Sequence, residues 1–140
     1  MELDTIVSLV TGMGFGGIVG VYFQFLFQRK QSLQDDIHQV KRARYGAIII
    51  QMLTILSPEH LPKTQKFRPD LKDIQDFKEE VKVEILHGIL FACDEVIKAM
   101  TEFVQEPSYS SYFKTVVAMR KDLWGRKAKI EEDDLTVFSL

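Results

Sequence analysis

Residues 5–27 read TIVSLVTGMGFGGIVGVYFQFLF and contain no charged side chain. At about 1.5 Å per residue, a helix of this length spans roughly 35 Å, more than the roughly 30 Å hydrocarbon core of a bilayer. A helix also satisfies its backbone hydrogen bonds internally, as lipid requires. The stretch therefore predicts a single transmembrane helix over residues 5–27, preceded by a short extracytoplasmic N-terminus over residues 1–4.

Small and polar residues recur at every fourth position of this stretch, and we call them the ladder face: Ser8, Gly12, Gly16, Gly20 and Gln24. Each four-residue step turns about 40° beyond a full circle, so these residues form one slowly winding face. Glycines on such a face let two membrane helices approach closely. We therefore expect helix packing here, against a second copy of the chain or another membrane protein.

Two other interpretations of the apolar stretch fit the sequence less well. A cleaved signal peptide has a basic segment before the apolar run, whereas Glu2 and Asp4 precede this one. Its end, Phe25-Leu26-Phe27, also lacks the small residues of a cleavage site. A buried helix of a soluble protein is seldom apolar on all faces.

A nucleotide site is the third alternative, because Gly12, Gly14 and Gly17 match the pattern G-x-G-x-x-G. A dinucleotide-binding unit continues with a helix that has one polar face, and then with a second strand. The residues that follow here are apolar, and residues 28–44 form a charged helical pattern without a strand. The sequence therefore favours the membrane span.

Charge on the two sides of the span predicts its orientation. Arg29 and Lys30 follow the apolar stretch, whereas no Lys or Arg precedes it. The positive-inside rule then places the N-terminus outside and residues 28–140 in the cytoplasm. A single cysteine, Cys93, excludes an internal disulfide and agrees with a reducing compartment. The net charge of −2 gives no field that attracts nucleic acid, so we expect a membrane partner and no nucleic acid.

The spacing of apolar residues after the span predicts an all-α protein with a small antiparallel bundle of three main helices. A polar helical stalk over residues 28–44 leads into a cytoplasmic helical bundle over residues 45–126, and a charged C-terminal tail covers residues 127–140. The first helix runs from about Arg29 to Leu56, where Pro58 ends it.

The second predicted helix begins near Asp70, a plausible N-cap, and ends before Pro107. Its length leaves open a break near Lys82 or Gly88, and Cys93 lies among its apolar residues. The third helix starts at Ser108 or Ser110 and ends at Gly125, a favourable C-cap. The tail forms one more turn or docks as an extended segment.

Glu84 and His87 form the sequence's candidate metal pair. They match Glu-x-x-His, which in di-metal carboxylate bundles occurs twice together with two further glutamates. One chain supplies a single pair, so a homodimer would be needed to complete such a site. A structural role for both residues is favoured, and we expect no catalytic residue and no cofactor.

A basic segment around the only tryptophan is the most distinctive part of the sequence after the span. It contains Arg120, Lys121, Trp124, Arg126, Lys127 and Lys129. These residues suit contact with anionic lipid or an acidic partner, with the tryptophan at the interface. The structural alternative, which the sequence favours, is a helix end whose cations complement the dipole, with Trp124 in the core.

Three functions follow from these features. The first is a membrane-anchored interaction or assembly protein that associates with itself through the ladder face. The second is a membrane-tethered metalloenzyme that uses Glu84 and His87. The third is a membrane-perturbing effector in which clustered anchors form a pore.

Overall fold

The computed structural model describes residues 2–127 and 129–139, with side chains described for residues 20–125, 127 and 129–135. Within these residues the chain consists of helices and connecting loops, with no strand. The predicted all-α fold class is therefore confirmed. The chain divides into two compact units, residues 1–37 and residues 38–140, and each is described by itself.

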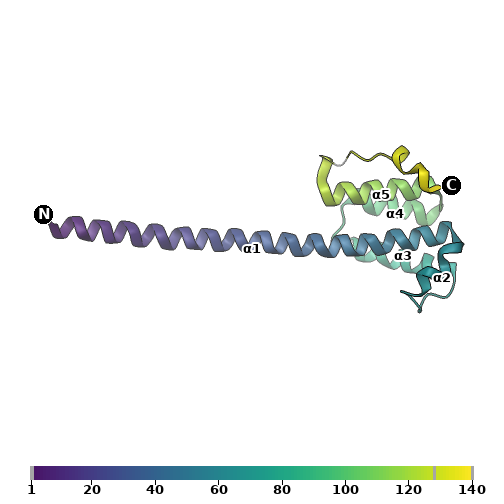
Figure 1. The fold of residues 1–140 in the computed structure, drawn as a ribbon, viewed down its shortest axis with the longest axis horizontal. Helices are drawn as coiled ribbons and strands as arrows, with labels where there is room; N and C mark the ends of the chain where they lie inside the picture. Colours follow the sequence, from purple (N-terminus) through teal and green to yellow (C-terminus); the bar gives the residue numbers. More distant parts are fainter. Residues whose placement is uncertain (1, 128, 140) are drawn as a thin grey trace. The chain divides into compact units, whose positions relative to one another are not determined.

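The first helix, α1, runs from Glu2 to Leu56 (Figure 1). It includes the whole predicted span and stalk, and it ends two residues before Pro58 as the sequence predicted. Residues 5–19, most of the predicted span, lie outside the residues whose side chains are described. Among the residues searched, no helix combines the length and the apolar character that crossing a membrane requires.

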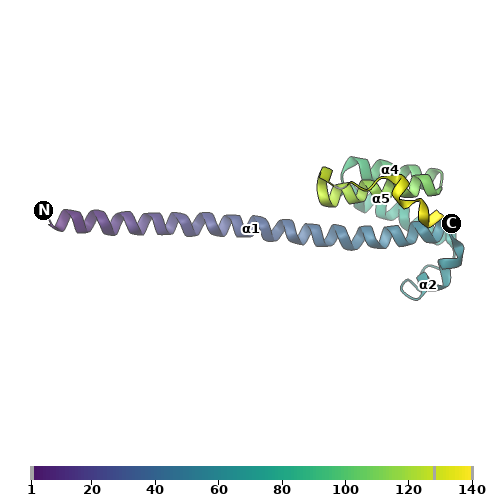
Figure 2. The same cartoon turned by 45° about the horizontal axis from the view of Figure 1, so that its top comes forward.

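Residues 38–140 contain the last part of α1 and the remaining helices. The α-helices are α2 (Leu61–Gln65), α3 (Ile74–Gly88), α4 (Asp94–Gln105) and α5 (Tyr109–Trp124), and the 3-10 helices are η1 (Pro58–His60), η2 (Gly125–Lys127) and η3 (Glu132–Ser139). α4 packs along α5 and also contacts α3, and the α4–α5 pair is visible in both orientations (Figures 1 and 2). Three residues, 106–108, join α4 to α5 and make the pair antiparallel.

The break near Gly88 that the sequence left open is present: the second predicted helix is divided into α3, which ends at Gly88, and α4, which begins at Asp94. Gly88 is buried, and a Cβ atom built there would lie 2.9 Å from Cδ1 of Ile97 in α4. The absent side chain therefore allows the two helices to approach each other. The break also ends the helical spacing, so Ile89 and Leu90 beyond it are exposed instead of entering the core, and Leu86 within α3 is exposed as well.

Helix ends in the bundle follow local signals. Ser108 caps α5: its Oγ accepts a hydrogen bond from Ser111 N at 3.1 Å, and Ser111 Oγ accepts one from Ser108 N at 3.1 Å. Gly125 ends α5 with φ of 72°, a conformation that favours glycine. These two predictions are confirmed, but the predicted N-cap at Asp70 is wrong. Asp73 caps α3 instead, with Oδ1 accepting from Asp76 N at 2.9 Å.

One hydrophobic core joins α1, α3, α4 and α5 within residues 38–140. The largest side chains with almost no exposure are Tyr45, Ile48 and Met52 of α1, Phe77 and Val81 of α3, Val96, Met100 and Phe103 of α4, and Met119 of α5. α2 is attached to α1 by the hydroxyls of Thr54 and Thr64, which lie 2.9 Å apart and are both buried. The amphipathic spacing therefore predicted the core-facing side of α1 correctly.

Candidate functional site

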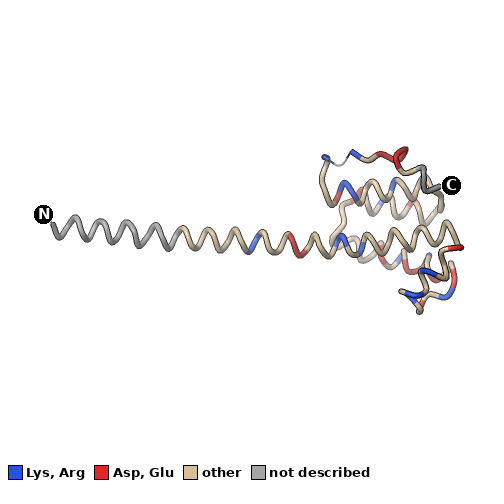
Figure 3. The backbone as a smooth tube through the Cα atoms, in the orientation of Figure 1, with Lys and Arg blue, Asp and Glu red and all other residues tan. Residues whose placement is uncertain are grey.

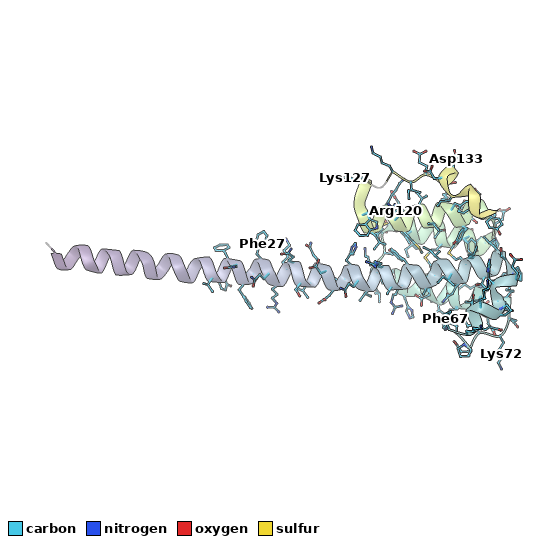
Figure 4. All side chains as sticks on the ribbon, in the orientation of Figure 1. Phe27, Phe67, Lys72, Arg120, Lys127 and Asp133 are labelled. Carbon is cyan, nitrogen blue, oxygen red and sulfur yellow. The ribbon has the colours of Figure 1, made fainter. Side chains whose placement is uncertain are left out.

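The first part of α1 with described side chains, residues 20–28, has no charge and exposes large apolar groups. Figure 3 shows this part without red or blue before Arg29, and Figure 4 shows Phe27 extending from the helix. The exposed fraction is 67% for Val21, 63% for Phe23 and 76% for Phe27. Because successive helical residues point about 100° apart, the large apolar groups of residues 21–27 surround about two thirds of the helix, and Gly20, Gln24 and Gln28 occupy the remaining face.

The ladder face is described only in part. Ser8, Gly12 and Gly16 lie outside the residues whose side chains are described, whereas Gly20 and Gln24 are described and exposed. No atom lies within 4 Å of a Cβ built on Gly20. In the single chain, this end of the ladder face is therefore open to another molecule.

The basic segment lies at the end of α5 and in the residues that follow it. Its described members are all exposed: Arg120, Lys121, Trp124, Lys127 and Lys129. The side chain of Arg126 lies outside the described residues. Figure 4 shows Arg120 and Lys127 at this end of the helix.

Trp124 is not in the core, so the structural interpretation favoured by the sequence is wrong for this residue. Its side chain is 56% exposed and contacts His38 of α1 edge-on, with ring centroids 5.1 Å apart. The tryptophan therefore presents part of its ring to solvent beside the cations of the same segment. Such a group can contact an interface or a partner surface.

A partly buried polar network connects α1 to the last turn of α5, and the sequence did not predict it. Asp122 accepts hydrogen bonds from Tyr45 OH at 2.5 Å and from Lys41 Nζ at 3.0 Å. The Asp122 and Lys41 side chains are 10% and 18% exposed, and Tyr45 is 2% exposed. This arrangement fixes the end of α5 against α1, next to the exposed basic segment.

The network also sets the protonation states of its members. Burial alone raises the pKa of the Asp122 carboxyl, but the hydrogen bonds from Tyr45 and Lys41 outweigh burial, and the pKa falls below its ordinary value. Burial, and then the hydrogen bond to Asp122, raise the pKa of Tyr45. At neutral pH, therefore, the Asp122 carboxylate is ionised, and the Tyr45 hydroxyl keeps its proton and donates a hydrogen bond to it.

Glu84 and His87 do not form a joint site. Arg44 donates to Glu84 Oε2 at 3.2 Å, and the same guanidinium lies 5.7 Å from the ring centre of Phe91. His87 is exposed one turn further along α3. Among the described residues, no three His, Cys, Asp or Glu side chains gather closely enough to hold a metal ion.

Cys93 precedes α4 and is half-buried, so the expectation that it lies within a helix is wrong. It lines an open depression together with Asp94, Glu95, Lys121, Asp122 and Gly125. The depression brings acidic and basic groups together at the end of the bundle that carries the basic segment. It is a polar surface suited to contact with a charged partner.

No protein-family model, curated protein or solved structure matches this chain. Its function must therefore be argued from its own residues.

Proposed function

We propose that this chain is a membrane-anchored helical interaction or assembly protein that associates with itself through the ladder face. One observation carries the proposal: residues 20–28 of α1 are uncharged and expose large apolar side chains on every side except the face of Gly20, Gln24 and Gln28. Transferring such groups out of water is favourable by about 25 cal/mol per Å² of apolar surface. Lipid, together with a partner helix, supplies the environment that this segment needs.

The anchor that we propose is a single transmembrane helix over residues 5–27. Arg29 and Lys30 lie just beyond its end, after Gln28, and favour a cytoplasmic position for residues 28–140. A polar stalk over residues 28–44 and a helical bundle over residues 45–126 then lie on the cytoplasmic side. The membrane is thus the first partner of the chain.

The ladder face supplies the second partner, another copy of the chain. Glycines allow two helix backbones to reach van der Waals contact, and a branched side chain prevents it. The open space around Gly20 supports this role, because nothing within the described part of the chain fills it. Another membrane protein with a small-residue face could bind in the same way.

Residues 38–140 then act as the cytoplasmic interaction domain. The features that support this role are the exposed Trp124, the cations around it, and the exposed apolar residues Leu86 and Leu90. Leu90 is 86% exposed and Leu86 is 66% exposed. Clusters of exposed large apolar residues are typical of surfaces that contact other molecules.

Membrane extraction tests the anchor. We expect the full chain to remain in the membrane pellet after alkaline carbonate treatment, because a transmembrane helix resists it. Complete release of the chain into the supernatant would contradict the proposed span.

A membrane-potential dye in the same cells tests the alternative that the chain is a membrane-perturbing effector. If it is, expression of the chain should reduce the membrane potential.

Crosslinking in native membranes tests the ladder face, with Gly16→Ile compared with Gly14→Ile. Position 14 lies about 160° away from position 16 around the helix, so it is a matched control with the same side chain. We expect Gly16→Ile to reduce the crosslinked dimer at least fivefold and Gly14→Ile to leave it unchanged. Equal dimer in both variants would rule out this face.

A further inference from the structure

One end of the bundle gathers segments from several helices, and we call it the entry end because α1 enters the bundle there. It consists of His38, residues 89–93 between α3 and α4, and residues 120–129 at the end of α5. Trp124 contacts His38, with ring centroids 5.1 Å apart, and Cys93 lines one depression together with Gly125. Figure 1 shows the α3–α4 connection and the end of α5 at this end of the bundle. These segments therefore share one surface.

The entry end exposes large apolar groups that the core does not use. Leu90 is the most exposed large hydrophobic side chain among the described residues, and Ile89 next to it is also exposed. Trp124, the only tryptophan of the chain, presents more than half of its side chain to solvent. A tryptophan ring has an apolar body and a polar N–H group, and such rings concentrate where lipid meets water.

Cations flank these apolar groups. Arg120 lies one turn before Trp124 on the same face of α5, and Lys127 and Lys129 follow the helix (Figure 4). All three cations are exposed, and within the described residues none of them forms an ion pair. Near an anionic membrane surface, each such cation contributes about 1 kcal/mol of attraction.

The acids at this end do not cancel the positive charge. Residues 120–129 contain five basic side chains and one acidic side chain, Asp122, which is bonded to Lys41 inside the bundle. Glu95 also lines the groove that contains Lys98, on the side of α4. Asp94 lies in the first turn of α4, where a carboxylate interacts favourably with the helix dipole. The exposed surface around Trp124 therefore remains basic.

The acidic tail is attached elsewhere on the bundle. The 3-10 helix η3 contacts α5, and its Leu135 packs against the hydrophobic core. Glu131, Glu132 and Asp133 line an open depression together with Lys121. We therefore do not count Lys121 among the cations that are available to a ligand.

The chain also keeps the entry end close to the proposed span. Residues 28–37 separate the span from His38, and α1 is helical through this stretch. Ten helical residues are about 15 Å long, so this length limits the distance between the span and the bundle. A surface held so close to lipid meets it at a high effective concentration.

We infer that the entry end docks on the anionic lipid headgroups of the membrane in which α1 is anchored. Trp124 and Leu90 enter the interface between headgroups and acyl chains, and Arg120, Lys127 and Lys129 contact lipid phosphates. The inference rests on the proposed anchor, and it names the partner of the basic segment.

The single tryptophan makes this docking measurable in the full chain. The chain is reconstituted into nanodiscs of phosphatidylcholine alone, or of equal parts phosphatidylcholine and phosphatidylserine. The readout is quenching of Trp124 fluorescence by acrylamide in the aqueous phase. We expect a quenching constant at least threefold smaller with phosphatidylserine, because the ring leaves water. Brominated phosphatidylcholine, which quenches from within the bilayer, should act on Trp124 only in the discs that contain phosphatidylserine.

Two pairs of substitutions locate the docking surface. Lys127→Glu with Lys129→Glu should abolish the effect of phosphatidylserine on acrylamide quenching. Lys63→Glu with Lys72→Glu changes the net charge equally at exposed positions outside the entry end and should leave the effect unchanged. Circular dichroism of each variant verifies that the helices remain folded.

Equal acrylamide quenching in the two lipid compositions would overturn the inference, and so would equal effects of the two lysine pairs. Carbonate extraction reads the anchor without phosphatidylserine and without Trp124. A chain that resists extraction but shows no effect of phosphatidylserine refutes the docking and leaves the anchor intact. A chain that carbonate releases refutes the anchor, and the docking inference falls with it.

Discussion

Two parts of the same helix differ in what surrounds them. In residues 20–37 of α1, Leu33 and Ile37 are each 55% exposed, whereas in residues 38–56, Ile48 and Met52 are at most 1% exposed. Both parts are helical and both carry large apolar residues. In the second part, the large apolar residues are buried in the chain's own hydrophobic core. The first part is helical without such a core, and its large apolar residues are exposed in the single chain.

Replacing Met52 by alanine tests the buried part and has the largest expected effect. Loss of a fully buried methionine side chain should lower the free energy of unfolding by about 2–5 kcal/mol, because a cavity remains. Leu33→Ala is the matched change in the exposed part and should alter it by less than about 0.5 kcal/mol. Urea unfolding in micelles, followed by the fluorescence of Trp124, measures both. Equal losses of unfolding free energy in the Met52→Ala and Leu33→Ala variants would contradict the difference between the two parts of α1.

Asp122→Ala tests the polar attachment of α1 to α5. It leaves the buried Tyr45 hydroxyl without its acceptor, and we expect a loss of about 2–3 kcal/mol in unfolding free energy at pH 7. The pKa of Asp122 is lowered in the folded chain, so its contribution is present above the ordinary value of 3.8 and is lost as pH falls through the folded value. The difference between the native chain and the variant should therefore shrink below pH 3.8. A difference that does not change with pH would contradict the role of the ionised carboxylate.

Gly88→Val tests the close contact that separates α3 from α4. A side chain at this position meets Cδ1 of Ile97, so we expect about 1–2 kcal/mol of destabilisation by overpacking. Adding Ile97→Ala to the Gly88→Val variant should recover part of the unfolding free energy that the clash removes. A double-mutant cycle, with urea unfolding of each variant, measures the coupling between positions 88 and 97. If the effects of the two substitutions on the unfolding free energy were additive, Gly88 would not be required for the close contact of α3 with α4.

Apart from the Leu33→Ala control, Gly46→Ala has the smallest expected effect, and its sign is opposite. Gly46 lies within α1, and no atom lies within 4 Å of a Cβ built there. Alanine should therefore stabilise the helix by roughly 0.5–1 kcal/mol. The same urea titration reports the change, and destabilisation would indicate that this face of α1 contacts another molecule under the conditions of the measurement.

Local signals in the sequence predicted the helix ends well. Pro58, Ser108 and Gly125 act through their own backbone or their immediate neighbours, so their effects can be predicted from the sequence alone. The break at Gly88 depends on a contact with Ile97, which only the packed structure shows. The apolar spacing of the sequence continues past that break, although Ile89 and Leu90 beyond it are exposed.

The candidate site was predictable only where its residues are adjacent in sequence. The basic segment is contiguous and was identified, but the position of Trp124 depends on His38, which is far away in the sequence. The partners of Asp122 lie 77 and 81 residues away, and no spacing rule relates positions so distant. The apolar groups of residues 20–27 were predicted because the absence of charge is a property of the segment itself.

The three-residue link between α4 and α5 has a consequence for biosynthesis. Its contacts are local, so this helical hairpin can form quickly once both helices have left the ribosome. Apart from Leu135 of η3, it is also the last part of the core to be made. At about 5–20 residues per second, the inward-facing side of α1 around Met52 waits several seconds for α5. During this interval the nascent chain exposes an unprotected apolar surface, and a chaperone or early membrane insertion would limit its aggregation.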